Sequence, residues 1–341
     1  MVSLFHMSTQ ALRWAHLDTG LPSLNLLLDI KMDAVLDVQS VPAHAAVWAV
    51  LANVVVSHLA EPGTTVALIE TLNAFEWEWL EAHPGYQQSW HAERRIRVYR
   101  LDTFAKLFLF FSATLLHGAT DKALLVLACN FHETVELYRL QLAACHEEIL
   151  VKHQIDITAV LWANRAKGAE EGYDLIDLPK LPKGSLLLRE SPAARFRKHL
   201  NVLLLLINSF AYRQSAVVFL QGYMEPRYKP YTYKSSAAAS QTASTASESP
   251  APNGFFSKQP ASRLVLVPVT FSKENDDHLG ENRLSSRLIF YNDWYFRSPH
   301  FRSERRPRDR SDCHFVSVVK VTNFHGVHSI NKPIYFDFLK N

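Results

Sequence analysis

The sequence is poor in cysteine, with only Cys129, Cys145 and Cys313 in a chain of 341 residues. An odd, low count without paired spacing excludes a disulfide framework and favours a reducing compartment. The 16 histidines include no His-Glu-x-x-His spacing. We therefore expect no metal site, and we interpret Cys129 as a small buried hydrophobic residue rather than a nucleophile.

Long apolar runs are missing as well. The longest ones, near Phe104 and at Asn201, fall short of the ~18 to 20 residues that a membrane span needs. The N-terminus has no basic start followed by an apolar run, so we expect no signal peptide. The sequence thus predicts no membrane partner.

The chain also has little net charge, +3, from 36 lysines and arginines against 33 aspartates and glutamates. A balance this mild does not by itself imply a nucleic-acid partner. Residues 284–341, however, carry ten basic side chains against five acidic ones. Positive charge is therefore concentrated at the C-terminal end.

What the sequence does have is an alternation of strand and helix patterns as far as residue 130. Strands are expected at four apolar segments: 34–39, 65–70, 95–101 and 123–128. Helices are expected at 43–59, at 73–83 and from 104 to 115, the last with Asp102 as its N-cap. This alternation predicts an α/β fold with a mainly parallel central sheet and helices on both faces.

Beyond residue 130 we expect a long helix at 132–153 and a further central strand at 201–210. The Ser-, Ala- and Thr-rich stretch 235–254 lacks large apolar residues and is expected to be disordered. Four later segments are interpreted as antiparallel strands that close the sheet: RLVLVPVTF, SRLIFYNDWYF, HFVSVVKVTNF and PIYFDFL. We divide the chain into an N-terminal arm (1–19), a core (20–233), an insert (234–262) and C-terminal strands that complete the core (263–341), with a basic loop at 297–310.

The turn after the first strand lies where a phosphate-binding loop would lie, between a strand and a buried helix. A P-loop needs glycines that let backbone N–H groups surround the phosphates, a lysine for the terminal phosphates and a hydroxyl for Mg²⁺. This turn has instead Ser40, Ala43, Ala45, Ala46 and Val47. Loss of the lysine contact alone costs about 1.5–3 kcal/mol, so tight ATP binding is not expected.

On this turn alone, a degenerate P-loop and an α/β domain that never had one are equally good interpretations. A second position favours the degenerate P-loop. A Walker B strand ends in an aspartate that positions Mg²⁺, whereas the strand LLVLA ends in Cys129. Metal binding would be lost there too.

Several segments, in their order and spacing, resemble the recombinase paralogues of the RecA family, those of eukaryotic homologous recombination. GLPSLNLLL (20–28) resembles the family's opening helix, with Asn25 in place of an aspartate. VQSVPAHAAVW lies where the family has its phosphate loop, and Pro42 alone is retained. ALIETLNAF (67–75) resembles the strand that usually carries Ile-Asp-Thr-Glu-Gly, and the family's catalytic glutamate would fall at Leu72.

The segments RRIRVYRLDTFAKLFLFF and SRLIFYNDW look most like the fungal paralogue that forms one half of a heterodimeric recombination mediator. The second segment matches a closing pattern of an arginine, apolar residues, an aspartate and a tryptophan through Arg287, Leu288, Ile289, Phe290, Asp293 and Trp294. The resemblance covers roughly residues 20–135 and 200–300. It implies a RecA-like core with degenerate Walker motifs, no ATPase activity and no cofactor.

The resemblance further implies a nuclear protein that pairs with a second recombinase paralogue. That pair would bind single-stranded DNA, associate with recombinase filaments and promote homologous recombination in double-strand-break repair. An alternative is a structural RecA-like subunit of another assembly, such as the Elongator accessory subcomplex in tRNA modification. A third possibility is an active ATPase with an unusual loop.

Two segments are candidates for binding partners. Aromatic and basic side chains interleave at 291–310, the scheme of single-strand binding, in which rings stack on bases and arginines neutralise phosphates. The arginines proposed for DNA contact are Arg297, Arg302, Arg305, Arg306, Arg308 and Arg310. The alternative is a core strand followed by a solvated basic loop. In the N-terminal arm, Phe5, Leu12 and Trp14 are candidates for docking onto a neighbouring subunit, unless the arm folds back onto its own domain.

Overall fold

The computed structural model describes the following residues: 17–28, 30–42, 44–114, 123–167, 176–180, 190–230, 262–267, 284–296, 313–323 and 333–336. Several predictions concern residues outside this set. They are the docking candidates Phe5, Leu12 and Trp14, the turn residue Ala43, all six arginines proposed for DNA contact, and the insert 234–262 apart from Ser262.

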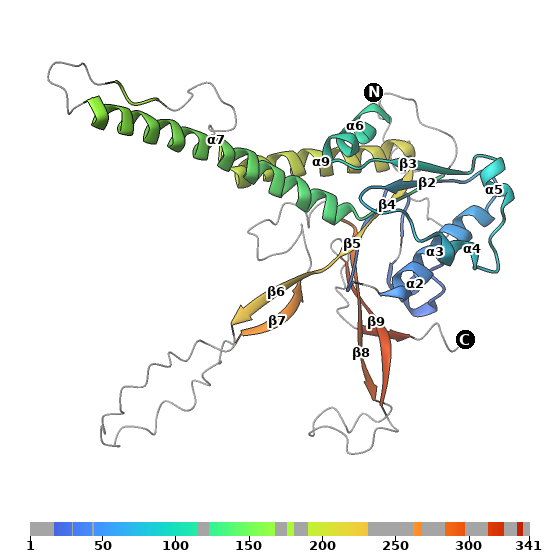
Figure 1. The fold of residues 1–341 in the computed structure, drawn as a ribbon. Coiled ribbons are helices and arrows are strands. Elements are labelled where there is room, and N and C mark those ends of the chain that lie inside the picture. Colours follow the sequence, from blue (N-terminus) through green and yellow to red (C-terminus); the bar gives the residue numbers. More distant parts are fainter. Residues whose placement is uncertain are drawn as a thin grey trace, which may run out of the picture.

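An eight-stranded sheet forms the centre of the molecule (Figure 1), in the order β3-β2-β4-β5-β1-β8-β9-β10. Its strands are β1 (Val35–Ser40), β2 (Thr65–Glu70), β3 (Ile96–Arg100), β4 (Leu124–Cys129), β5 (Ala216–Tyr223), β8 (Ser286–Phe296), β9 (Cys313–Asn323) and β10 (Pro333–Phe336). Every pair from β3 to β8 is parallel, and β9 is antiparallel to both of its neighbours. The predicted α/β class, with a mainly parallel sheet and antiparallel pairing at its C-terminal end, is therefore confirmed.

Helices cover both faces of this sheet, as the alternating pattern predicted. On one face, α2 (Pro22–Leu28), α3 (Ala45–Ala60), α4 (Trp77–Glu81) and α5 (Ser89–Ala92) contribute to a core that includes Leu36 and Val38 of β1. On the other face, α6 (Phe104–Thr114), the first turns of α7 (Phe131–Lys167) and α9 (Pro192–Gln214) pack over Val35 and Val218. Because each central strand is buried on both sides, its sequence is a nearly continuous apolar run.

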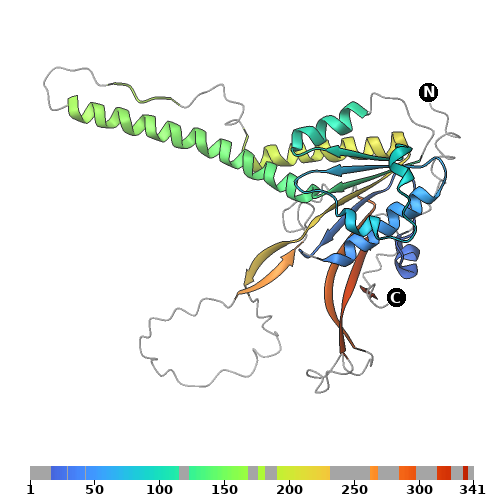
Figure 2. The ribbon, with the colours of Figure 1, turned by 45° about the vertical axis from the view of Figure 1, so that its right-hand side comes forward.

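The helix α7 is the longest element, with 37 residues. It starts against the sheet beside α9 and then extends well away from the core (Figure 2). The predicted helix at 132–153 is thus confirmed, and it continues further than predicted. None of the helices in the described part of the chain is both long and apolar enough to span a membrane.

The strand predicted at 201–210 was wrong, because these residues lie inside α9. Ser191 caps this helix through its Oγ, which accepts a hydrogen bond from the backbone N–H of Ala194. Its buried residues recur at helical spacing: Leu200, Leu203, Leu204, Ile207, Phe210, Ala211 and Gln214. The run looked uniformly apolar because leucines also occupy exposed positions such as Leu205. The central strand is β5, directly after this helix.

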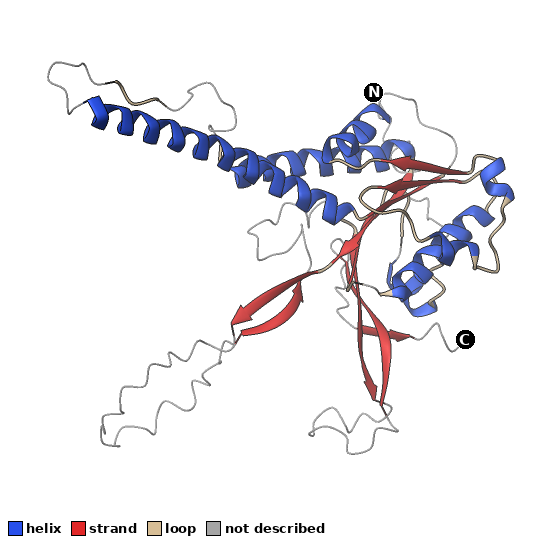
Figure 3. Cartoon of the chain, in the orientation of Figure 1, coloured by secondary structure: helices blue, strands red, loops and turns tan. Residues whose placement is uncertain are grey.

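The C-terminal strands also differ from the prediction. The segment from Ser262 to Val267 forms β7, which pairs with β6 (Glu225–Pro230) in a separate two-stranded ribbon (Figure 3) and does not close the main sheet. β8 runs parallel to β1 and antiparallel only to β9. Hydrophobic alternation predicts a strand but cannot predict its neighbour, and this ambiguity produced both errors.

One helix cap and one helix length differ from the prediction. The first turn of α6 is capped by Thr103, whose Oγ1 accepts from the backbone N–H of Lys106 at 3.3 Å, whereas Asp102 forms a salt bridge with the Lys106 ammonium group. The predicted helix at 73–83 is reduced to the five residues of α4.

Asn25 uses both ends of its amide to hold the residues that precede α2. Its Oδ1 accepts from the backbone N–H and the hydroxyl of Thr19, and its Nδ2 donates to Asp18 at 2.7 Å. An aspartate could accept the first two bonds but could not donate the third.

Candidate functional site

The carboxyl ends of the parallel strands meet at one edge of the sheet, which is where open α/β sheets bind their ligands. The turn that we interpret as a degenerate phosphate loop follows β1 at this edge, and Cys129, interpreted as a degenerate Walker B residue, lies at the end of β4. β5 lies between these two strands. The fold therefore places both positions at the same edge, as a nucleotide site would require.

The turn after β1 uses its backbone groups in the sheet. The N–H of Val41 donates to the carbonyl of Phe290 in β8 at 3.0 Å, and the Ser40 carbonyl accepts from Met224 at 2.8 Å. α3 then begins with Ala45, Ala46 and Val47, and Val47 is fully buried in the core. The described part of this turn provides neither the glycine conformations nor the lysine that hold phosphates.

Cys129 is fully buried, as predicted for a small hydrophobic residue. Burial strongly raises the pKa of its thiol, and the carboxylates of Glu70 and Glu76 raise it further. Its backbone carbonyl accepts a hydrogen bond from the Thr71 hydroxyl at 2.7 Å. An uncharged thiol at this position cannot replace the carboxylate that would steer Mg²⁺.

Leu72, where the resemblance leads us to expect a catalytic glutamate, has 43% of its side chain exposed. The neighbouring carboxylate, Glu70, is buried and already has partners. It accepts from the backbone N–H of Phe75 at 3.2 Å and from Trp77 Nε1 at 3.3 Å, and it lies 3.5 Å from the guanidinium of Arg100. Glu70 therefore holds the loop after β2 in place and is not available to activate water.

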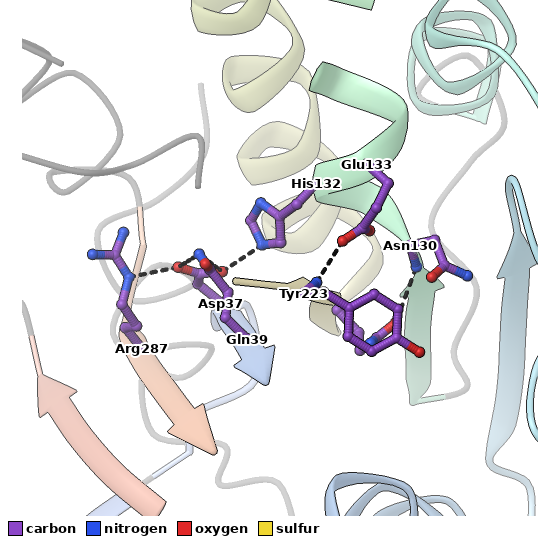
Figure 4. A network of polar contacts seen from close by, with 8 residues as sticks. Asp37, Gln39, Asn130, His132, Glu133, Tyr223 and Arg287 are labelled. Atoms are coloured by element: carbon purple, nitrogen blue, oxygen red, sulfur yellow. Dashed lines mark hydrogen bonds and ion pairs between the residues drawn. The ribbon is translucent and has the colours of Figure 1, made fainter. Parts of the chain in front are cut away.

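A buried ion cluster lies close to this edge, on the face covered by α7 and α9 (Figure 4). The Asp37 carboxylate, fully buried in β1, accepts from Arg287 Nε at 2.6 Å and from His132 Nε2 at 2.7 Å. Gln39 Nε2 donates to both carboxylate oxygens, at 3.0 and 3.1 Å. We call these four residues the Asp37 cluster.

The Asp37 cluster forms because three elements converge on one carboxylate. Asp37 and Gln39 alternate with the apolar residues of β1, so their side chains point to the opposite face. Arg287 is the register neighbour of Asp37 across the β1–β8 pair. His132 is the second residue of α7, which starts directly after the left-handed Asn130, with φ of 54°. The cluster thereby connects β1, β8 and α7.

Gly222 of β5 makes room for the start of α7. A Cβ at this position would lie 2.7 Å from the Cβ and Cδ2 atoms of His132 and 2.9 Å from Glu133 Oε2. Any larger residue would therefore displace the helix from the sheet, because interiors are close-packed.

The electrostatics of the cluster follow from burial and pairing. Burial alone would raise the pKa of Asp37, but the charges and hydrogen bonds of His132 and Arg287 outweigh it and lower this pKa below its ordinary value. A carboxylate saturated by three donors has no free lone pair aimed at a substrate. The arrangement can hold elements together, but it cannot supply a base or a nucleophile.

A second polar group lies beside the cluster, at the ends of β4 and β5. Gln221 Oε1 accepts from the backbone N–H of Asn130 at 3.0 Å, and Glu133 Oε1 accepts from the backbone N–H of Tyr223. Burial raises the pKa of Glu133 despite the nearby His132. Among the described residues, the buried side-chain atoms without a hydrogen-bond partner include Ser40 Oγ, Asn130 Oδ1, Glu133 Oε2 and Gln221 Nε2. Each such atom costs about 1–3 kcal/mol unless water or a ligand reaches it.

Sequence reasoning did not identify the Asp37 cluster. One signal was available, because an aspartate in the middle of the apolar strand VLDVQS must be paired if the strand is central. Its partners are 95 and 250 positions away in the sequence, so only the fold brings them together. In the described part of the chain, no three His, Cys, Asp or Glu residues are grouped so that they could hold a metal ion. The side chain of Phe290 is fully buried.

Comparison of the sequence with protein-family models and with curated proteins found no match. The residues and the fold therefore carry the functional argument.

Proposed function

We propose that this chain is a RecA-like recombinase paralogue that does not hydrolyse ATP. It pairs with a second paralogue in the nucleus, binds single-stranded DNA and recombinase filaments, and promotes homologous recombination in double-strand-break repair. The proposal combines the resemblance of its segments with the arrangement of the carboxyl edge.

The proposed lack of ATP hydrolysis rests on the residues at the carboxyl edge of the sheet. One strand, β5, separates the strand with the phosphate turn from the proposed Walker B strand, as a nucleotide site would need, yet three groups that such a site would use are engaged internally or uncharged. The backbone of Val41 pairs with β8, Cys129 is an uncharged buried thiol, and Glu70 is engaged by Phe75 and Trp77. The strand order also differs from the 3-2-1-4-5-6 and 2-1-3-4-5 orders of dinucleotide-binding and flavodoxin-like folds.

Nucleotide binding is the first test. We expect no saturable binding of a fluorescent ATP analogue at micromolar concentrations, with or without Mg²⁺, because the described residues of the turn after β1 include no lysine for the phosphates and the thiol of Cys129 cannot hold Mg²⁺. Saturable micromolar binding would support the active-ATPase alternative instead.

The pathway is tested by purifying the tagged chain from its native cells and identifying the proteins that accompany it. Recovery of a second recombinase paralogue together with the recombinase supports the proposal. Recovery of Elongator subunits refutes the pathway and supports a structural role in tRNA modification.

DNA contact is tested separately, by fluorescence anisotropy with a labelled single-stranded oligonucleotide and the purified pair. Replacement of Arg302, Arg305 and Arg306 by alanine should weaken binding and reduce its dependence on salt, because fewer counterions are released. Arg100→Ala, on the far edge strand with 89% of its side chain exposed, is the matched control. Equal binding by both variants would remove the basic loop from the proposal.

A further inference from the structure

The distal half of α7 carries an apolar stripe on a helix that extends away from the core. Ile155 and Trp162 have 61% and 65% of their side chains exposed, and Val151 has 50%. Helices in water are stabilised mainly by packing of an apolar face, so a long helix with large exposed apolar residues indicates a missing partner.

The exposed stripe has coiled-coil spacing. Val151, Ile155, Thr158 and Trp162 follow each other at intervals of four, three and four residues, which is the alternation of a and d positions in a heptad. Thr158 donates its hydroxyl to the Gln154 carbonyl in its own helix at 2.8 Å. The hydroxyl of Thr158 therefore keeps its hydrogen bond when this residue is buried against a second helix.

The chain's own return segment lies on the opposite side of α7. The Asn164 side chain donates to the Ile176 carbonyl and accepts from the Ile176 N–H, both at 2.8 Å. Asn164 is two positions after Trp162, which places the two side chains about 200° apart around a helix of 3.6 residues per turn. The described residues 176–180 therefore dock away from the stripe of Val151, Ile155 and Trp162.

Charges at the two ends of the stripe favour an identical helix in antiparallel orientation. Glu148 and Arg165 are both exposed. They lie three positions before Val151 and three positions after Trp162, so they continue the heptad spacing at each end. When two copies of such a helix pair antiparallel, the a positions of one copy face the d positions of the other. Glu148 then meets Arg165 of the second copy, twice, about a two-fold axis between Asp156 and Ile157.

The same axis also aligns the apolar stripe. Pairing of Glu148 with Arg165 places Val151 opposite the second copy's Trp162, and Ile155 opposite its Thr158. Each layer thus combines an a position with a d position, and a larger residue with a smaller one, which favours interdigitation. Charge and apolar spacing were derived from different residues, and they specify one register.

The two cores can be accommodated in this arrangement. From Asp156 back to the start of α7 at Phe131 is 25 residues, or about 37 Å of helix at 1.5 Å per residue. The cores therefore lie at opposite ends of the paired helices, and Figures 1 and 2 show α7 leaving the core on its own side.

We propose that residues 148–165 of α7 bind a second copy of this chain as an antiparallel helix pair, with Val151, Ile155 and Trp162 in the seam. This contact does not depend on the proposed function. It is short, about 27 Å by the same rise per residue, so it belongs among small interfaces, and we expect a Kd on the order of 10 µM.

Sedimentation velocity of the full chain, from about 1 to 100 µM, tests the proposal. The wild type should shift from monomer to dimer over this range, and Ile155→Asp should weaken dimerisation at least about tenfold, because it buries an unpaired charge in the seam. Leu109→Asp, on α6 with 63% of its side chain exposed, is the matched control and should dimerise like the wild type. Far-UV circular dichroism verifies that each variant retains its helices.

Charge reversal tests the orientation. Glu148→Arg and Arg165→Glu should each weaken the dimer, because each places like charges opposite each other, and the double variant should restore it. A chain that stays monomeric at the highest concentration, or a dimer insensitive to Ile155→Asp, would overturn the interface. Failure of the double variant to recover would overturn the antiparallel register.

Discussion

The Asp37 cluster gives the sharpest stability prediction. Arg287→Met keeps most of the side-chain volume but removes one of the charges that compensates a fully buried carboxylate. Breaking a buried ion pair from one side typically costs about 3–5 kcal/mol, because the remaining charge loses its compensation. At roughly 2–4 °C per kcal/mol, the melting temperature should fall by about 6–20 °C.

Urea unfolding followed by tryptophan fluorescence measures this loss. The double variant Asp37→Leu/Arg287→Met removes both charges, so it should be more stable than Arg287→Met alone by about 1–3 kcal/mol. A loss below about 1 kcal/mol for Arg287→Met, or a double variant whose loss equals the sum of the two single losses, would refute the claim that the two side chains form a coupled buried pair.

The dependence on pH provides an independent check. The folded-state pKa of Asp37 lies below its ordinary value of 3.8, so the stabilisation by its carboxylate is complete above about pH 4 and is lost as pH falls through the lowered pKa. Asp37→Asn cannot titrate. The variant should therefore lose less stability than the wild type between about pH 4 and pH 2, and an identical acid limb in both proteins would contradict the assignment.

Three further predictions concern packing, capping and pH. Gly222→Ala should destabilise the fold by about 1–3 kcal/mol, because its Cβ would overlap His132 at the start of α7, and unchanged unfolding in urea would mean that α7 can shift freely. Arg95→Met should lower the free energy of unfolding by about 1.5–3 kcal/mol, since the Arg95 guanidinium donates to the carbonyls of Glu61 at 2.7 Å and Thr64 at 3.1 Å after α3. Arg100→Met, at an exposed position, should lower it by less than about 1 kcal/mol. Burial lowers the pKa of His58 below 6.5, so the stability that the neutral side chain contributes is present above that pH and is lost as pH falls. The melting temperature of His58→Gln should therefore fall less than that of the wild type between pH 7.5 and 5.5. Equal drops in the two proteins would show that His58 is not the responsible group.

Several features could be predicted from the sequence because they depend on local patterns. The strands at 35–40, 65–70, 96–100 and 124–129 are apolar runs bounded by polar residues or turn formers, and α3 and α6 follow from helical periodicity. The absence of a lysine after Ala45 and of a carboxylate at Cys129 can be observed directly. These residues by themselves determine that the turn after β1 is not an ordinary phosphate-binding loop.

Other features were decided only by the tertiary structure. The run 201–210 is apolar enough for a buried strand or a helix, and packing of α9 against α6 and α7 selects the helix. Whether β8 pairs parallel or antiparallel with the core depends on which strand adjoins it, and that strand, β1, is 250 residues away. For the same reason Asp37 could be recognised as needing partners, but His132 and Arg287 could not be named, since the compensation of a buried charge depends on distance in space and not on spacing in the sequence.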